Sequence, residues 1–124
     1  MRVLVAARDV RVRRALSRLL ELDGGRIVGA TDALGSLPEL DEQAGPDVVV
    51  LELDRREDPR DLRIVAELVR RGRAVIAVAS GSTRCAGVLA AGARACLDKD
   101  ADFTDRLAQA VRAVPGPLPS PPPA

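Results

Sequence analysis

The sequence contains no histidine, tryptophan or tyrosine, and Phe103 is its single aromatic residue. Without imidazole, the chain has no histidine to serve as a catalytic base, a nucleophile or a metal ligand. It also lacks any Gly-rich phosphate-binding motif. These absences exclude many classes of enzyme, and we therefore expect a protein that is not an enzyme and that needs no cofactor.

Cysteine is scarce too, since Cys85 and Cys96 are the only two in the chain. Their spacing does not match a zinc site, and two cysteines in a chain of this kind are more often reduced than bonded. We expect two reduced, partly buried small side chains rather than a disulfide.

Long apolar runs are missing as well. No stretch approaches the roughly 20 residues that span a membrane, and the first nine residues are too short and too quickly charged for a signal peptide. The formal net charge is only +1, so nothing global indicates binding to nucleic acid or to an acidic membrane. The expected location is the cytoplasm.

The 124 residues are 47% apolar, which is enough for one domain with a buried core. The most informative stretch is PDVVVLELD, which begins at Pro46. Its unbroken apolar run, Val48 to Leu51, predicts a strand buried on both faces of a parallel sheet. Glu52 ends that run, and ligand sites in such sheets lie at the carboxyl ends of the strands. Glu52 is therefore either part of a site or a solvated acid.

Strands and helices are predicted to alternate along the chain. Apolar runs predict the strands, and three-four spacing of apolar residues predicts the helices. Short connections favour a doubly wound α/β fold, in which helices cover both faces of a parallel sheet. The expected strands are residues 2–6, 26–30, 48–51, 74–79 and 94–97, and the expected helices are residues 9–23, 33–43, 60–71, 82–91 and 102–114.

The chain changes character at Pro115, where it reads PGPLPSPPPA. Such a segment has too few backbone N–H groups to join a sheet and favours an extended, polyproline-like conformation. We assign residues 1–114 to a single domain. Residues 115–124 are either a Pro-rich linker or a disordered tail.

The predicted topology brings polar groups together at the strand ends. The first, third and fifth strands end near Asp9, Glu52 and Lys99, and the fourth ends at Ala79 and Ser80. A carboxylate that faces a lysine, with a hydroxyl nearby, is suited to phosphoryl groups, because the acid attacks or binds and the ammonium neutralises charge.

Over nearly all of residues 1–114 the chain resembles the receiver domain of bacterial two-component response regulators, most closely those with a LuxR-type helix-turn-helix. RVLVAARDVRVRRALSRLLE, PDVVVLEL and AVIAVAS carry the resemblance, and LAAGARACLDKDAD is the most specific part. It implies a flavodoxin-like sheet of five parallel strands in the order 2-1-3-4-5, with five helices. In typical members it also implies a cytoplasmic switch that a histidine kinase phosphorylates on aspartate with the help of magnesium.

The chain departs from the family pattern at the phosphorylation site. The phosphoacceptor aspartate falls on Glu52, whose extra methylene moves the carboxylate outward by roughly one bond length and disfavours in-line attack. The acids that hold magnesium fall on Ala7 and Arg8, so the resemblance predicts no metal site. Arg8 either occupies the space of the magnesium ion or points to solvent. Asp9 is expected to cap the following helix rather than to bind a cation.

The switch residues differ as well. The switch hydroxyl falls on Ala79, with Ser80 beside it, and the switch aromatic falls on Cys96. Of the site residues in the family pattern, only the lysine, Lys99, matches. The predicted pocket therefore combines these residues with those at the end of the first strand, and it has no catalytic residue.

An intact core pattern with altered strand ends predicts an atypical receiver domain. We expect a phosphorylation-independent signalling and dimerisation module, the N-terminal part of a transcriptional regulator. The alternatives are a receiver that senses a small molecule in the vacated pocket and a stand-alone protein-binding adaptor. A homodimer is expected, with DNA contacted only through a possible C-terminal helix-turn-helix domain outside this sequence. A histidine kinase is not favoured as a partner.

Overall fold

Five parallel strands form one sheet in the order β2-β1-β3-β4-β5. The structure is a computed structural model that describes residues 1–53, 58–79, 82–99 and 102–114, with Ser82 and Thr83 described in their backbone alone. This order confirms the predicted flavodoxin-like topology. The strands are β1 (Arg2–Ala6), β2 (Arg26–Thr31), β3 (Val48–Leu53), β4 (Ala74–Ala79) and β5 (Ala95–Asp98).

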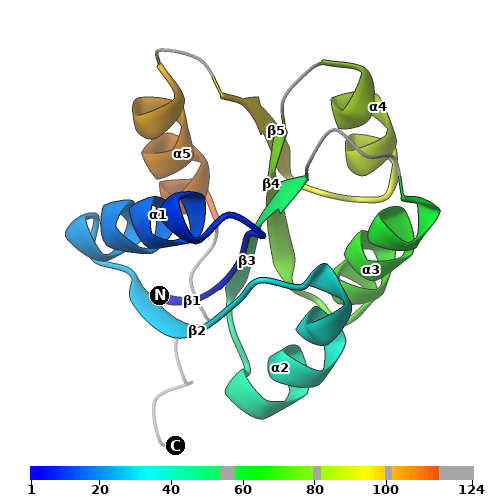
Figure 1. Ribbon diagram of the computed structural model, residues 1–124, viewed down its shortest axis with the longest axis horizontal. Helices are drawn as coiled ribbons and strands as arrows, with labels where there is room; N and C mark the ends of the chain where they lie inside the picture. The colour runs from blue at the N-terminus through cyan, green and yellow to red at the C-terminus, as the bar shows by residue number, and fades with distance from the viewer. Residues whose placement is uncertain (54–57, 80–81, 100–101, 115–124) are drawn as a thin grey trace, which may run out of the picture.

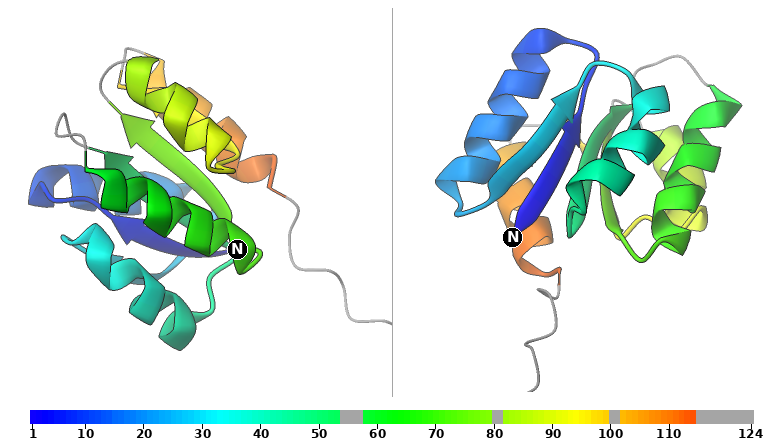
Figure 2. Two further views of the ribbon diagram at one scale, coloured as in Figure 1. Left: turned by 90° about the vertical axis from the view of Figure 1, so that its right-hand side faces the viewer. Right: turned by 90° about the horizontal axis from the view of Figure 1, so that it is seen from below.

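Five α-helices alternate with these strands and cover both faces of the sheet, as predicted. α1 and α5 pack on one face, and α2, α3 and α4 pack on the other (Figures 1 and 2). The helices are α1 (Val10–Leu22), α2 (Leu37–Ala44), α3 (Pro59–Arg70), α4 (Ser82–Ala90) and α5 (Phe103–Arg112), and a short 3-10 helix, η1 (Leu34–Ser36), precedes α2.

The two central strands supply the middle of the core. All residues of β3 and β4 are buried. Successive side chains of a strand point to opposite faces, so Val48 and Val50 pack under α1 and α5 while Val49 and Leu51 pack under α2 and α3. By the same alternation Glu52 belongs to the face covered by α1 and α5. β3 continues to Leu53, so Glu52 lies within the strand rather than after its end.

Helix α2 begins later than predicted. The expected helix of residues 33–43 is divided into η1 and α2, with Pro38 in the first turn of α2. Proline lacks the backbone N–H that a helix interior needs but is well tolerated in the first turn. Gly45 then ends α2 with a φ of 56°, a left-handed conformation that glycine adopts at little cost.

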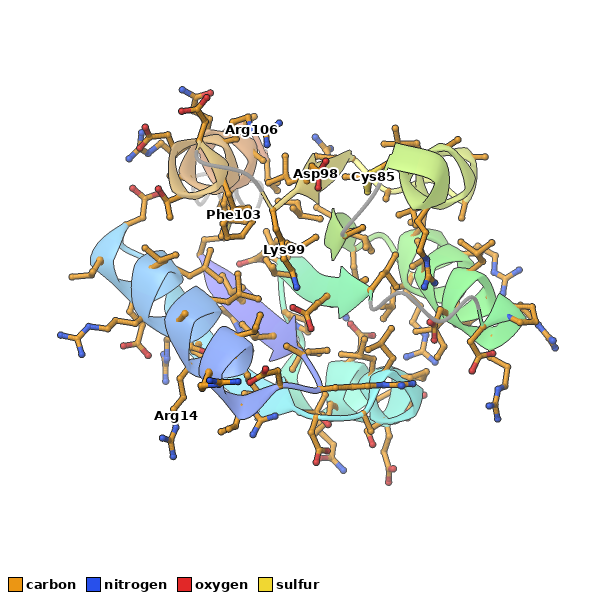
Figure 3. All side chains as sticks on the ribbon, turned by 45° about the horizontal axis from the view of Figure 1, so that its top comes forward. Arg14, Cys85, Asp98, Lys99, Phe103 and Arg106 are labelled. Carbon is orange, nitrogen blue, oxygen red and sulfur yellow. A yellow bond between two sulfur atoms is a disulfide. The ribbon has the colours of Figure 1, made fainter. Side chains whose placement is uncertain are left out.

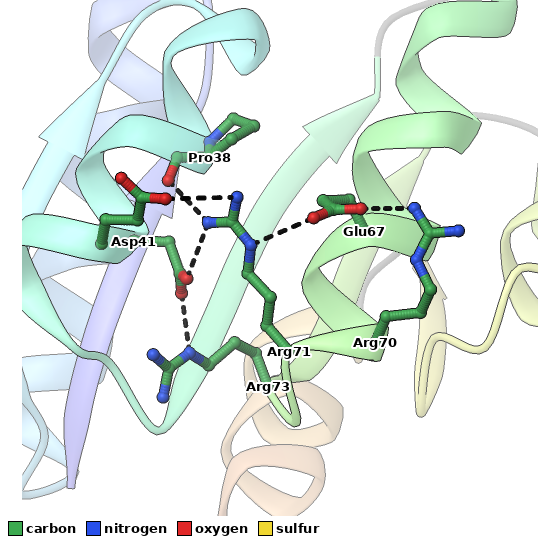
Figure 4. Close-up of polar contacts among 7 residues, drawn as sticks. Pro38, Asp41, Glu67, Arg70, Arg71 and Arg73 are labelled. Atoms are coloured by element: carbon green, nitrogen blue, oxygen red, sulfur yellow. Dashed lines mark hydrogen bonds and ion pairs between the residues drawn. The ribbon is translucent and has the colours of Figure 1, made fainter.

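A polar cluster joins α2, α3 and β4 at the amino end of the sheet (Figure 4). Asp41 is only 1% exposed. Its carboxylate accepts hydrogen bonds from Arg73 Nε at 2.8 Å and from Arg71 Nη1 at 3.1 Å. Arg71 Nη1 also donates to the carbonyl of Pro38 at 2.7 Å. We call Asp41, Arg71 and Arg73 the Asp41 cluster.

The charges around Arg71 reinforce one another. The hydrogen bond to Asp41 raises the pKa of Arg71, burial opposes this rise, and Glu67 adds to it. Arg70 and then Arg71 lower the pKa of Glu67. Arg71 and Glu67 are therefore charged at neutral pH, and their contacts are a structural connection between helices.

The predicted Pro-rich segment, residues 115–124, lies outside the described residues. Within the part of the chain that the structure describes, we find no helix with the length and apolar character needed to cross a membrane.

Candidate functional site

The carboxyl ends of the strands meet at one edge of the sheet, which Figure 3 shows obliquely, with the top of the Figure 1 view turned toward the reader. Glu52 of β3 is opposite Val78 of β4, and Ala79 of β4 is opposite Asp98 of β5. Lys99 directly follows β5. The register thus places the end of β5 next to the acid of β3, across the end of β4.

Glu52 and Lys99 form an ion pair at this edge. Lys99 Nζ donates a hydrogen bond to Glu52 Oε2. The pair connects two strands that are not neighbours, and it confirms the predicted contact between these two residues. The Glu52 side chain is 6% exposed, whereas that of Lys99 is 34% exposed. The carboxylate therefore depends on Lys99 for compensation of its charge more than the ammonium depends on Glu52.

Among the described residues at the end of β1, the one acidic side chain, Asp9, is already engaged in capping α1. Ala7 is fully buried, and its carbonyl accepts a hydrogen bond from Arg13 Nη1 at 2.9 Å. Asp9 Oδ1 accepts a hydrogen bond from the backbone N–H of Arg11 at 2.8 Å, which lowers the pKa of Asp9 and confirms that this residue caps α1.

These residues do not fit a magnesium ion. Magnesium prefers oxygen ligands, one or two carboxylates among them. At the described strand ends the Glu52 carboxylate is paired with Lys99, the Asp9 carboxylate caps a helix, and a guanidinium lies against the carbonyl of Ala7. A cation here would meet fixed positive charge rather than a set of acids.

Arg8 is exposed and lies at the same edge. Asp58, the N-cap of α3, has a lowered pKa chiefly because Arg60 donates hydrogen bonds to it, and the charge of Arg8 contributes further. Arg8 thus acts electrostatically on the start of α3. Its predicted role as a substitute for magnesium beside Glu52 stays a prediction.

Comparison with solved structures identifies the fold. The receiver domain of the NarL response regulator from Mycobacterium tuberculosis is 26% identical to this chain, with a TM-score of 0.76, over 90% of this chain and 92% of that domain. A LuxR-family DNA-binding response regulator from Staphylococcus aureus is 21% identical, with a TM-score of 0.78, over 91% of this chain and 97% of that one. The chain has the fold of a response-regulator receiver domain.

A third similar structure is the response regulator domain of CheB from Thermotoga maritima, at 20% identity and a TM-score of 0.78, over 94% of this chain and 98% of that one. No protein-family model matches the chain, and no curated protein matches it by sequence. The assignment to the receiver fold thus rests on the comparison of structures.

The structure describes both residues that the resemblance predicts at the switch positions, Ala79 and Cys96. Ala79 is fully buried at the end of β4, and Ser80 lies outside the described residues. Cys96 lies in β5 and is bonded to Cys85 of α4.

The prediction of two reduced cysteines is therefore wrong. The reason is tertiary, because α4 packs back on β5 and brings the two Cα atoms to 5.3 Å, which is within the usual range for a disulfide.

Sequence reasoning also missed a buried ion pair near this edge of the receiver fold. Arg84 Nη2 lies 3.5 Å from Asp61 Oδ2, and the two side chains are 8% and 9% exposed. The pair connects the first turn of α3 to α4. The residues are 23 positions apart, so no local pattern pairs them, although an acid at a helix start and an arginine in a short helix are both visible in the sequence.

A small apolar cavity adjoins Lys99. Its volume is about 220 Å³, and it lies between α1 and α5 above β4, where Figure 3 shows Lys99 and Phe103 side by side. Apart from Lys99 its lining is aliphatic or aromatic. The lining residues are Val12, Ala15, Leu16, Leu19, Val78, Lys99 and Phe103.

Proposed function

We propose that the chain is an atypical receiver domain that signals without phosphorylation. The ion pair between Glu52 and Lys99 supports this most. The residue at the phosphoacceptor position is a buried glutamate whose charge a lysine already neutralises, and the positions of the magnesium ligands are Ala7 and Arg8. A phosphoryl group would arrive at a carboxylate without metal oxygens to stabilise the developing charge.

The role that fits such a domain is regulatory and not enzymatic. The similar structure from Staphylococcus aureus is described as a DNA-binding response regulator of the LuxR family. By analogy, we place this domain in the N-terminal part of a cytoplasmic transcriptional regulator, in which a separate helix-turn-helix domain contacts DNA. A histidine kinase is not required as a partner.

Treatment with acetyl phosphate and magnesium is expected to leave the mass of the protein unchanged. Ala7 and Arg8 supply no side-chain oxygens for the metal, so charge that develops during transfer is not compensated. Intact-mass spectrometry is the measurement, with Glu52→Gln as the matched variant. A one-phosphate increase that appears in the natural chain and is lost in Glu52→Gln would defeat the proposal.

A homodimer is the proposed form of the domain. A receiver that phosphate cannot switch still sets the spacing and symmetry of attached DNA-binding modules when it pairs about a two-fold axis. Val88 and Val114 are buried in the core and offer no surface for pairing. Leu22 at the end of α1 and Leu89 of α4 are 76% and 47% exposed and supply apolar surface for it.

Static light scattering at micromolar concentration is expected to give twice the mass of the chain. Repetition in high salt tests whether the contact is apolar, because exposed ion pairs weaken under those conditions while buried apolar surface does not. A monomeric mass in both conditions would refute dimerisation by this domain and favour the stand-alone adaptor.

A second candidate function is the sensing of a small molecule, and the cavity beside Lys99 favours it. A volume of about 220 Å³ with an apolar lining and one ammonium at its edge suits a compact apolar molecule with an anionic group. A screen of such acids for a rise in melting temperature distinguishes this candidate from the first, because a purely protein-binding receiver gives no rise.

A further inference from the structure

The disulfide between Cys85 and Cys96 joins helix α4 to strand β5. Cys96 is in β5, paired with Ala77 of the fully buried strand β4. Cys85 is in the first turn of α4, whose outer residues are exposed. The bond therefore fastens a helix at the surface to a strand that the sheet holds in place (Figure 3).

Both cysteines are partly exposed. Small thiols reach a disulfide sulfur only when it is accessible to solvent. Redox-active cysteines in general combine accessibility with a second cysteine within reach. Cys85 is partly exposed and lies next to Cys96.

The fold does not depend on the bond to bring the two cysteines together. α4 is also held by Val88, which is fully buried, and by the buried ion pair between Arg84 and Asp61 of α3. The Cα separation of 5.3 Å is ordinary for a disulfide. The reduced and the oxidised chain can thus share one fold, which is the condition for reversible exchange.

We propose that Cys85 and Cys96 form a reversible thiol–disulfide switch that responds to low-molecular-weight disulfides and thiols of the glutathione type. In oxidation the Cys85 thiolate attacks the small disulfide, forms a mixed disulfide and releases one small thiol. The Cys96 thiolate then attacks Cys85 Sγ, closes the protein disulfide and releases the second small thiol. Two electrons and two protons pass from the protein to the small disulfide, and reduction is the reverse.

The switch acts on the α4–β5 surface of the receiver fold. The disulfide ties α4 to β5, and Lys99 lies three residues after Cys96 at the end of that strand. Oxidation therefore fixes α4 against the strand that leads to the Glu52–Lys99 pair, whereas reduction leaves α4 held by noncovalent contacts. This redox switch does not require phosphorylation, and the proposal is independent of whether Glu52 accepts a phosphoryl group.

The first test is a redox titration of the full chain. The protein is equilibrated in glutathione buffers from fully reduced to fully oxidised, quenched with acid and alkylated, and the two forms are counted by intact mass. We expect comparable amounts of both forms within the buffer range, with the same distribution from either starting state. A disulfide that persists in every buffer is a permanent cross-link, and cysteines that stay reduced in oxidised glutathione never form the bond; either result overturns the proposal.

The second test asks what the bond does to α4. Amide hydrogen exchange of residues 84–90 is expected to accelerate at least about tenfold on reduction, because local opening no longer works against a covalent tether, while α1 stays unchanged. The double variant Cys85→Ser/Cys96→Ser closely keeps the side-chain size, has no thiol, and should match the reduced chain in every buffer. Equal exchange in the oxidised and reduced chains would overturn control of α4, and a shift in a serine variant between buffers would show that another group is responsible.

Discussion

Replacement of Asp41 by alanine is expected to lower the free energy of unfolding by about 2–4 kcal/mol. Asp41 is 1% exposed, and it accepts hydrogen bonds from Arg71, directly after α3, and from Arg73, directly before β4. Without the carboxylate, Arg71 and Arg73 keep their positive charges side by side in a partly desolvated place. Their side chains are 26% and 29% exposed, so water offsets part of the loss, which sets the upper limit of this range.

Glu42 supplies a matched control on the same helix. It is the next residue, it also faces Arg71, at 3.8 Å, and its side chain is 73% exposed. Exposed ion pairs contribute little to stability, so Glu42→Ala should change the free energy of unfolding by less than about 0.5 kcal/mol. Urea denaturation of both variants measures the difference. Equal effects would mean that burial of Asp41 does not determine the strength of the Asp41 cluster.

The architecture could be predicted because its signals are local. β3 and β4 are continuous apolar runs, which are typical of strands covered on both faces, and both are fully buried. α1 carries apolar residues at three-four spacing, and Leu16 and Leu20 are buried as that spacing requires. Parallel strands joined by helices leave few possible topologies. The resemblance then selected one strand order, and the sheet has that order.

The polar contacts that connect the elements could not be predicted in the same way. The disulfide, the Asp61–Arg84 pair and the Asp41 cluster each join residues on different helices or strands, between 11 and 32 positions apart in the chain. No periodic pattern relates such residues, because their contact depends on how the elements pack. The predicted start of α2 was wrong for a different reason. A 3-10 turn precedes the helix and a proline lies in its first turn, so α2 begins later than the apolar pattern suggests.

The contact between Glu52 and Lys99 is intermediate between the predictable architecture and the unpredictable contacts between elements. Glu52 and Lys99 are 47 positions apart, and no local pattern joins them. Their contact could be predicted because both lie at the ends of parallel strands, where the topology itself brings distant residues to one edge. The role of Arg8 could not be predicted in this way. It lies in a connection rather than in a strand, and the topology fixes only its approximate place.

The two residues of the Glu52–Lys99 pair should be strongly coupled, and replacing each one alone should cost a different amount of stability. Lys99→Met keeps the length of the side chain and removes its charge, which leaves a carboxylate that is 6% exposed without a cation. We expect a loss of about 2–4 kcal/mol in the free energy of unfolding. Glu52→Gln leaves an ammonium that is 34% exposed and is free to turn toward water, so the expected loss is only about 1 kcal/mol. The double variant should be more stable than the sum of these losses implies, by at least about 1 kcal/mol.

Asp98→Asn is the control for this cycle, because Asp98 is an exposed acid directly before Lys99 at the same edge. Its replacement should change stability by less than about 0.5 kcal/mol and should add independently to Glu52→Gln. Simple additivity of Lys99→Met and Glu52→Gln would show that the two charges do not stabilise each other. The Glu52 carboxylate would then not be neutralised in advance, and the main support for a receiver that works without phosphate would be lost. Unequal losses with strong coupling would instead identify Lys99 as the group that holds Glu52 in a permanently compensated state.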